Sequence, residues 1–153
     1  MYRTSNTLSE NSRSKAAEVL NRHLAAAIDL HAQVKQAIGM RGPTFIAVHE
    51  LLDKVAEAVE DYSDTIAERA GALGATIHFA VRRSYHEQYK LGVADEKSHF
   101  AAVTAARAAF GDSARKAIDE TAAFGEQDTS DVFTEVSRGV DYELRLVESH
   151  LQP

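Results

Sequence analysis

Four side chains of the types that bind metal ions lie along one helical stripe between residues 42 and 69. They are His49, Asp53, Asp64 and Glu68. On an ideal helix the three carboxylates lie about 40°, 60° and 100° from the histidine, so all four share one stripe. Helical bundles hold iron with such imidazole and carboxylate ligands on the inward face of a long helix. The same spacing also suits a polar face turned to solvent, and periodicity alone leaves both interpretations open.

Two shorter motifs match known metal-binding patterns less closely. HELLD at residues 49–53 departs from the zinc-protease pattern H-E-x-x-H, because Asp53 replaces the second histidine. Glu96 and His99 form one E-x-x-H, whereas a di-iron centre inside a single bundle needs two such motifs and two further glutamates. We therefore interpret Glu96 to His99 as the solvated first turn of a helix.

Composition limits the class of protein. A chain of 153 residues that is 44% hydrophobic suits a single domain with a sizeable core. The chain has no cysteine, so a metal site must use oxygen and imidazole ligands, and a reducing cytoplasm fits. We see no membrane-length apolar run and no apolar signal-peptide core. The formal charge of −6 argues against a generic nucleic-acid binder.

Apolar positions spaced by three and four predict an all-α domain. We expect long helices at about 11–38, 43–79, 95–124 and 128–151, with Asp128 as the last N-cap and Gly125 as a C-cap. Residues 1–8 are expected to form a flexible arm, and 9–153 the helical domain. One longer connection, at 82–92, has room for a short helix. This order predicts a four-helix bundle with a crossover, the ferritin-like arrangement.

The segment that carries the stripe resembles the signature of the Dps family, the ferritin-like DNA-binding proteins from starved cells. The family pattern of G-x-x-F, H-x-x-x-D and D-x-x-x-E-R is matched by Gly42 to Phe45, His49 to Asp53 and Asp64 to Arg69. The stretches IDLHAQVKQA and SRGVDYELRLVESHLQ resemble the first and last helices of the family. The resemblance therefore covers nearly the whole chain.

The resemblance implies an activity and an assembly. Twelve copies would form a hollow shell that oxidises iron(II), preferably with hydrogen peroxide, and stores the ferric mineral inside. Each bundle would have a short helix in its middle connection. The di-iron sites would be shared between two-fold related chains, with His49 and Asp53 of one chain facing Asp64 and Glu68 of the other. Such a cage protects the cell against oxidative damage.

The chain departs from the family pattern at Ala37. Relatives usually have a histidine there, followed by Trp-Asn, whereas this chain reads Ala37-Ile38-Gly39. Alanine has no lone pair, so the first iron site loses an imidazole. Arg145 also stands where many relatives have a tryptophan. A structural or storage cage with an inactive ferroxidase centre is therefore an alternative function.

His78 is a candidate for the missing imidazole. If the two second helices pair antiparallel across a two-fold axis, position 78 faces position 39 of the partner, beside Ala37. On an ideal continuous helix His78 also lies about 20° from His49. The rival, His31, lies about 240° from Ala37 on the first helix. A histidine-enriched site should bind zinc as well as iron, so we expect zinc to occupy it and inhibit oxidation.

DNA binding, the second activity of the family, is not expected to be strong here. The N-terminal segment has only Arg3, Arg13 and Lys15, set against Glu10. Twelve copies of a chain with a charge of −6 would repel phosphate at long range. A DNA-compacting cage stays an alternative that a binding assay can test.

Overall fold

The protein is a bundle of four long α-helices. The computed structural model describes residues 1–78 and 96–150. The helices are α1 (Glu10–Ala37), α2 (Phe45–Ala72), α3 (Glu96–Ala123) and α4 (Gln127–Glu148). The described residues contain no strand. The predicted all-α four-helix bundle is confirmed.

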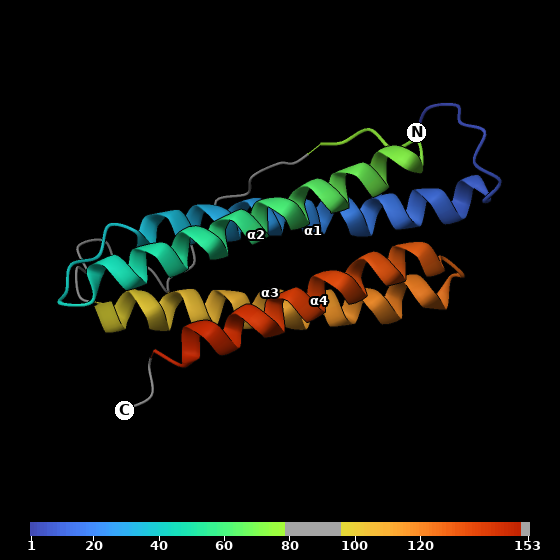
Figure 1. Cartoon of the computed structure of the whole chain (residues 1–153). Coiled ribbons are helices and arrows are strands. Elements are labelled where there is room, and N and C mark those ends of the chain that lie inside the picture. Colours follow the sequence, from blue (N-terminus) through green and yellow to red (C-terminus); the bar gives the residue numbers. More distant parts are fainter. Residues whose placement is uncertain (79–95, 151–153) are drawn as a thin grey trace.

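The helices form two antiparallel pairs. α1 packs mainly against α2, and α3 mainly against α4, and the two pairs lie one above the other (Figure 1). α2 ends at the end of the bundle where α4 begins, so α2 and α3 run parallel (Figure 1). A parallel pair of consecutive helices needs a connection that returns along the bundle, which is the ferritin-like crossover. The short helix expected in this connection lies outside the described residues.

The apolar stripes of all four helices meet in one core. Its bulkiest buried apolar side chains include Leu20, Leu52, Ile66, Phe100 and Phe133. Truncating a buried phenylalanine to alanine typically costs about 3–5 kcal/mol, so the two phenylalanines are major contributors to stability. No helix in the described part of the chain is long and apolar enough to cross a membrane.

The second helix ends earlier than the sequence suggested. α2 stops at Ala72, and Gly74 has a φ of +77°. The backbone N–H of Tyr2 donates to the Gly74 carbonyl at 2.8 Å, and the Tyr2 hydroxyl donates to the Gly71 carbonyl at 2.6 Å. The N-terminal segment is thus hydrogen-bonded to the backbone at the end of α2. The predicted extension of this helix toward Phe79 is therefore wrong. Apolar periodicity could not show this, because the contact joins distant parts of the chain.

The last helix has its N-cap two residues earlier than predicted, whereas the predicted C-cap glycine is confirmed. Gly125 has a φ of +82° and follows the end of α3, as a C-cap glycine does. α4 begins at Gln127 with Glu126 at the N-cap position, so the prediction that Asp128 is the N-cap is wrong. The Arg69 guanidinium donates to both carboxylate oxygens of Glu126, at 2.9 and 2.8 Å. That ion pair buries Glu126 and ties the turn to α2.

Candidate metal centre

One half of the candidate centre is formed on the first turns of α2. His49 Nδ1 lies 3.0 Å from Asp53 Oδ2, one helical turn away, and both side chains are partly exposed. The Phe45 ring packs edge-on against the imidazole, with ring centroids 5.4 Å apart. The two side chains therefore point to the same surface, where an imidazole nitrogen and a carboxylate oxygen are available to one cation.

The other half lies farther along the same helix. Asp64 and Glu68 are exposed one turn apart. Eleven residues separate Asp53 from Asp64, which corresponds to about 16 Å along the helix axis. The described residues of one chain contain no group of three or more His, Asp or Glu side chains close enough to hold a metal ion. Each chain thus presents two separate pairs of ligand-type side chains.

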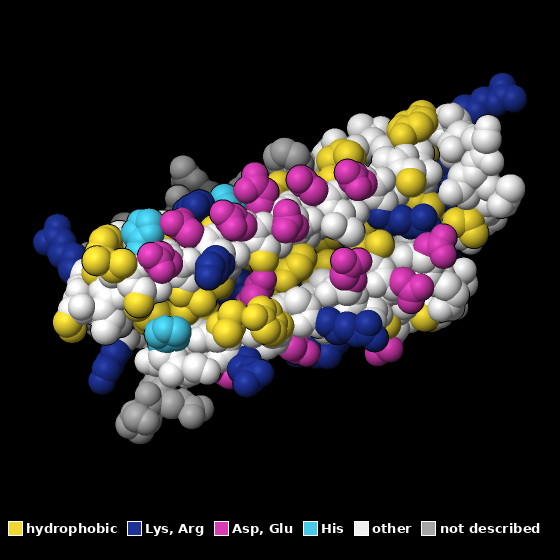
Figure 2. All heavy atoms as spheres, in the orientation of Figure 1, with side chains coloured by type: hydrophobic (Ala, Val, Ile, Leu, Met, Phe, Trp, Pro, Cys, Tyr) yellow, Lys and Arg dark blue, Asp and Glu magenta, His cyan; other side chains and the backbone are white. Residues whose placement is uncertain are grey.

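Acidic side chains surround the second pair. Figure 2 shows carboxylates gathered in a row along the exposed face of α2. The exposed acidic residues of this helix are Glu50, Glu57, Glu60, Asp61, Asp64 and Glu68. The sequence-based prediction named only the ligand pairs, although the same helical spacing would also have shown the longer row. Such a surface attracts cations.

At the end of α1, Ala37 is buried in the core and Lys35 reaches the first pair. Ala37 is the last residue of α1 and is fully buried, and Met40 packs close by in the core. Lys35 extends from the last turn of α1, and its Nζ lies 3.4 Å from Asp53 Oδ1. α1 thus contributes an ammonium group to Asp53. A protonated amine has no lone pair, so Lys35 competes with a metal ion instead of binding it.

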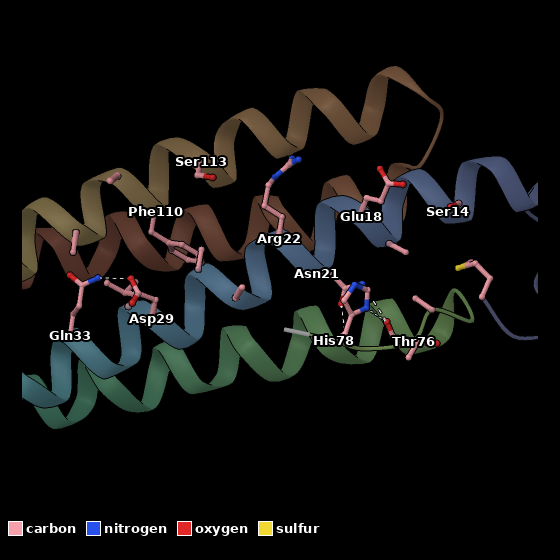
Figure 3. A pocket seen from close by; sticks show the side chains of 18 residues that line it. Ser14, Glu18, Asn21, Arg22, Asp29, Gln33, Thr76, His78, Phe110 and Ser113 are labelled. Carbon is pink, nitrogen blue, oxygen red and sulfur yellow. Dashed lines mark hydrogen bonds between the residues drawn. The ribbon is translucent and has the colours of Figure 1, made fainter. Parts of the chain in front are cut away.

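His78 lies on a different structural element from the one predicted. It follows the end of α2, and its backbone N–H donates to Asn21 Oδ1 of α1 at 3.3 Å. It lines a cavity of about 800 Å³ whose walls come mainly from α1 and α3 (Figure 3). None of His49, Asp53, Asp64 and Glu68 lines that cavity. The continuous helix that would have placed His78 on the same stripe as His49 is therefore absent between Ala72 and His78.

His99 is not part of a solvated turn. It is buried near the start of α3, and the neighbouring Phe100 ring stacks on His150 with centroids 5.8 Å apart. The interpretation of Glu96 to His99 as a solvated turn is wrong for the histidine. The Glu96 side chain lies outside the described residues.

A buried polar cluster inside the bundle was not foreseen from the sequence. The Tyr62 hydroxyl of α2 donates to Glu143 Oε1 of α4 at 3.1 Å, and the fully buried Arg107 of α3 forms an ion pair with the other carboxylate oxygen. Burial lowers the pKa of Arg107 to about 10, so it stays charged at neutral pH. Burial likewise raises the pKa of Tyr62, which keeps its proton. Arg107 and Glu143 occupy positions of apolar stripes, where ion pairs are unusual.

Comparison with known proteins shows which family the chain belongs to. A ferritin-like domain family matches residues 17–153. The DNA protection during starvation protein of Agrobacterium fabrum is 35% identical over 156 residues, which cover 99% of this chain and 96% of the relative. DpsC from Streptomyces coelicolor superposes with a TM-score of 0.89 at 27% identity, over 99% of this chain and 92% of that one. The chain belongs to the Dps family.

A third relative has been solved in a high iron form. This protein, Dps from Microbacterium arborescens, is 30% identical with a TM-score of 0.82, over 98% of this chain and 99% of that one. Membership in the Dps family supports iron binding and a role in iron storage and protection. Similarity to Dps structures supports assembly into an oligomeric cage.

Proposed function

We propose that this Dps-family protein oxidises iron(II) with hydrogen peroxide and stores the ferric product in a dodecameric cage, in a reducing compartment such as the cytoplasm. The oxidation site is shared: His49 and Asp53 of one chain face Asp64 and Glu68 of a two-fold related copy. The observation that carries the proposal is the separation of the two ligand pairs along α2, because antiparallel pairing of two copies of this helix joins complementary pairs.

The ligand chemistry supports iron as the substrate. Carboxylates bridge hard cations, and imidazole suits iron and zinc, so the combined set holds borderline divalent metals with positions left for an oxidant. Oxidised iron is a harder, more acidic ion and moves to carboxylates. The acidic row along α2 provides such a surface next to the site (Figure 2). Consuming iron(II) and peroxide together limits hydroxyl radical formation.

Complementation between two inactive variants tests whether the site is shared. One variant carries His49→Ala and Asp53→Ala, and the other carries Asp64→Ala and Glu68→Ala. In a mixed two-fold pair, one of the two sites combines intact residues from both chains, while the second loses all four. We therefore expect each variant alone to lose peroxide-dependent iron oxidation, and co-assembled mixtures to regain part of it. A mixture as inactive as its parents would contradict a shared site.

The control for this test changes residues away from the ligands. His31→Ala, on α1, should leave the initial rate of iron oxidation unchanged. If the wild-type protein does not oxidise iron at all, the inactive storage cage becomes the better description. Ala37 and the ion pair of Lys35 with Asp53 are the observations that favour that second candidate.

His78 stays a prediction as an additional ligand. The shared site does not require His78. The helix register that favoured this residue assumed a continuous helix, and α2 ends at Ala72. His78→Ala should slow iron oxidation if the side chain reaches the partner's site, and an unchanged rate would exclude it. Zinc titrated into the same assay should inhibit oxidation if zinc occupies the centre.

A further inference from the structure

The interior of the bundle holds a polar cluster that iron binding does not use. Tyr62, Arg107 and Glu143 come from three different helices and meet between them. A buried ion pair often adds no net stability compared with apolar side chains of the same volume. Arg107 Nε and Nη1 also lack a hydrogen-bond partner among the described residues. Packing alone therefore does not account for this cluster.

The space for the Tyr62 phenol is provided by a glycine. Gly139 lies in the middle of α4, one turn before Glu143, and a Cβ atom at that position would overlap the Tyr62 hydroxyl. Glycine inside a helix is unfavourable because it loses more conformational freedom than any other residue. Its position lets the phenol pass beside α4 and reach the Glu143 carboxylate.

Tyr62 is arranged to lose an electron and a proton together. Oxidation of a tyrosine by one electron makes its phenol strongly acidic, so a hydrogen-bonded base that accepts the proton favours the reaction. Glu143 is such a base, 3.1 Å from the hydroxyl. By contrast, Tyr142 is 62% exposed, and Tyr2 donates to a backbone carbonyl. The chain has no tryptophan and no cysteine that would be oxidised in its place.

Tyr62 also lies close to the proposed iron site. Asp64 is two residues further along α2, about 200° around the helix, so the carboxylate lies on the outer face and the phenol on the inner face. An α-helix with its side chains is about 10–12 Å wide. Electrons tunnel readily through protein over such a distance.

Reduction of hydrogen peroxide at the proposed iron site needs a second electron when only one iron(II) is bound. Reduction of hydrogen peroxide to the level of water takes two electrons, and one iron(II) supplies one. Ala37 offers no ligand atom, and the Lys35 ammonium lies 3.4 Å from Asp53, so a turnover starting with a single bound iron is favoured here. Without a second donor, that turnover releases a hydroxyl radical.

We propose that Tyr62 donates the second electron and Glu143 accepts the phenolic proton, an inference that rests on the proposed function. Iron(II), the Tyr62 phenol, the Glu143 carboxylate and hydrogen peroxide give iron(III), a Tyr62 phenoxyl radical, protonated Glu143 and two hydroxide ions. The O–O bond and the phenolic O–H bond break, and one O–H bond forms on Glu143. Iron and tyrosine each lose one electron, and peroxide gains both.

Arg107 makes the step reversible. Protonation of Glu143 leaves the buried guanidinium without its counter-charge, which is costly. The proton therefore returns to the phenol when a later iron(II) reduces the radical. Tyr62 acts in this scheme as a relay that is restored after each turnover.

Electron paramagnetic resonance on freeze-quenched samples tests the proposal. The full-length assembled protein is loaded with limiting iron(II) without oxygen and mixed with hydrogen peroxide. We expect a tyrosyl radical in the wild type and in the control Tyr142→Phe, and loss of that radical in Tyr62→Phe. Wild-type protein that oxidises iron without forming a tyrosyl radical, or an undiminished radical in Tyr62→Phe, overturns the proposal.

A double variant tests the role of Glu143. Arg107→Met with Glu143→Gln removes the base without leaving a buried charge unpaired, and circular dichroism confirms that it folds. Tyr62 is still present, so a purely structural role for the carboxylate predicts an unchanged radical. We expect the radical to be lost, and its persistence would show that Glu143 is not the proton acceptor.

Photochemical oxidation separates this inference from the proposed function. A chain with Tyr2, Tyr85, Tyr89 and Tyr142 changed to phenylalanine keeps Tyr62 as its only tyrosine. Photo-oxidised ruthenium tris-bipyridine then oxidises it in the absence of iron. If no variant oxidises iron, the proposed function fails while this measurement still decides the inference. A Tyr62 radical whose yield falls when Arg107→Met and Glu143→Gln are added supports it, and an equal yield with and without Glu143 rejects it.

Discussion

At the scale of single residues, Asp53 has two competing partners. His49 lies 3.0 Å from one carboxylate oxygen and Lys35 lies 3.4 Å from the other. The histidine would share a metal ion with Asp53, whereas the lysine replaces one. Helical spacing could predict that His49 and Asp53 lie one turn apart on the same face of α2, while their role as metal ligands stays a prediction. The ion pair could not, because it joins residues of two helices whose relative placement is a property of the fold.

Removing the Lys35 ammonium should strengthen metal binding. An ion pair between partly exposed groups is worth up to about 1 kcal/mol, so Lys35→Met should tighten iron(II) binding by up to about fivefold. Anaerobic isothermal titration calorimetry measures this affinity. Lys54→Met, which removes an exposed charge from the neighbouring position, serves as the control. Equal affinity of Lys35→Met and the wild type would show that the ion pair does not compete.

His23 should make stability depend on pH. Burial lowers its pKa below the usual value, against the weaker raising effect of hydrogen bonds to the carbonyls of Val19 and Ser113. The folded state therefore prefers the neutral ring and binds fewer protons than the unfolded state. The stabilisation is complete above the unfolded pKa of about 6.5 and is lost as pH falls below it, with a slope of at most about 1.4 kcal/mol per pH unit.

Urea unfolding between pH 7.5 and 5 measures this effect, with protein concentration held fixed because assembly contributes to stability. His23→Gln keeps a polar side chain without a titrating group, so its free energy of unfolding should depend less steeply on pH. His150→Gln, at an exposed position, should keep the wild-type slope. An identical slope in all three proteins would remove His23 as the cause.

At the scale of secondary structure, the sequence predicted the helices better than their ends. The bounds of α1 and α3 agree with the prediction within one or two residues, because apolar spacing and the capping residue Ser9 act locally. The ends that differ depend on distant contacts. Tyr2 binds the end of α2, and Arg69 holds Glu126 at the start of α4. Neither contact has a periodic signal, since each joins segments more than fifty residues apart.

Gly74→Ala should loosen the N-terminal segment. An L side chain at a φ of +77° is strained, and its Cβ would lie 2.9 Å from the Tyr2 carbonyl oxygen. Left-handed backbone costs a non-glycine residue about 1–2 kcal/mol, so we expect at least that loss of stability. Faster tryptic cleavage after Arg3 should accompany it.

Gly71→Ala is the matched control for Gly74→Ala. Gly71 is helical, and a Cβ added at this position would have nothing within 4 Å, so alanine there should be neutral or stabilising by up to about 1 kcal/mol. Thermal unfolding of both variants compares them directly. Equal effects would show that neither the backbone angle nor the Tyr2 contact matters.

At the scale of the whole molecule, charge and assembly decide what the cage can bind. The described residues of one chain present two separate pairs of ligand-type side chains on α2, so the proposed centre needs a second copy. The sequence could indicate this sharing only through resemblance, because symmetry between chains is not written in helical periodicity. Each copy in an assembly also adds a formal charge of −6.

This charge should prevent DNA binding. Phosphate is attracted by clustered lysine and arginine, and residues 1–8 contain only Arg3, while Tyr2 fastens the segment to α2. We expect no retardation of linear DNA in a gel shift at low salt and neutral pH. A variant with Ser5→Lys, Asn6→Lys and Thr7→Lys should bind, because a multivalent cage repeats each new charge in every copy. Binding by the wild type that weakens with added salt would contradict the prediction, and failure of the lysine variant would show that the docked segment, not its charge, limits access.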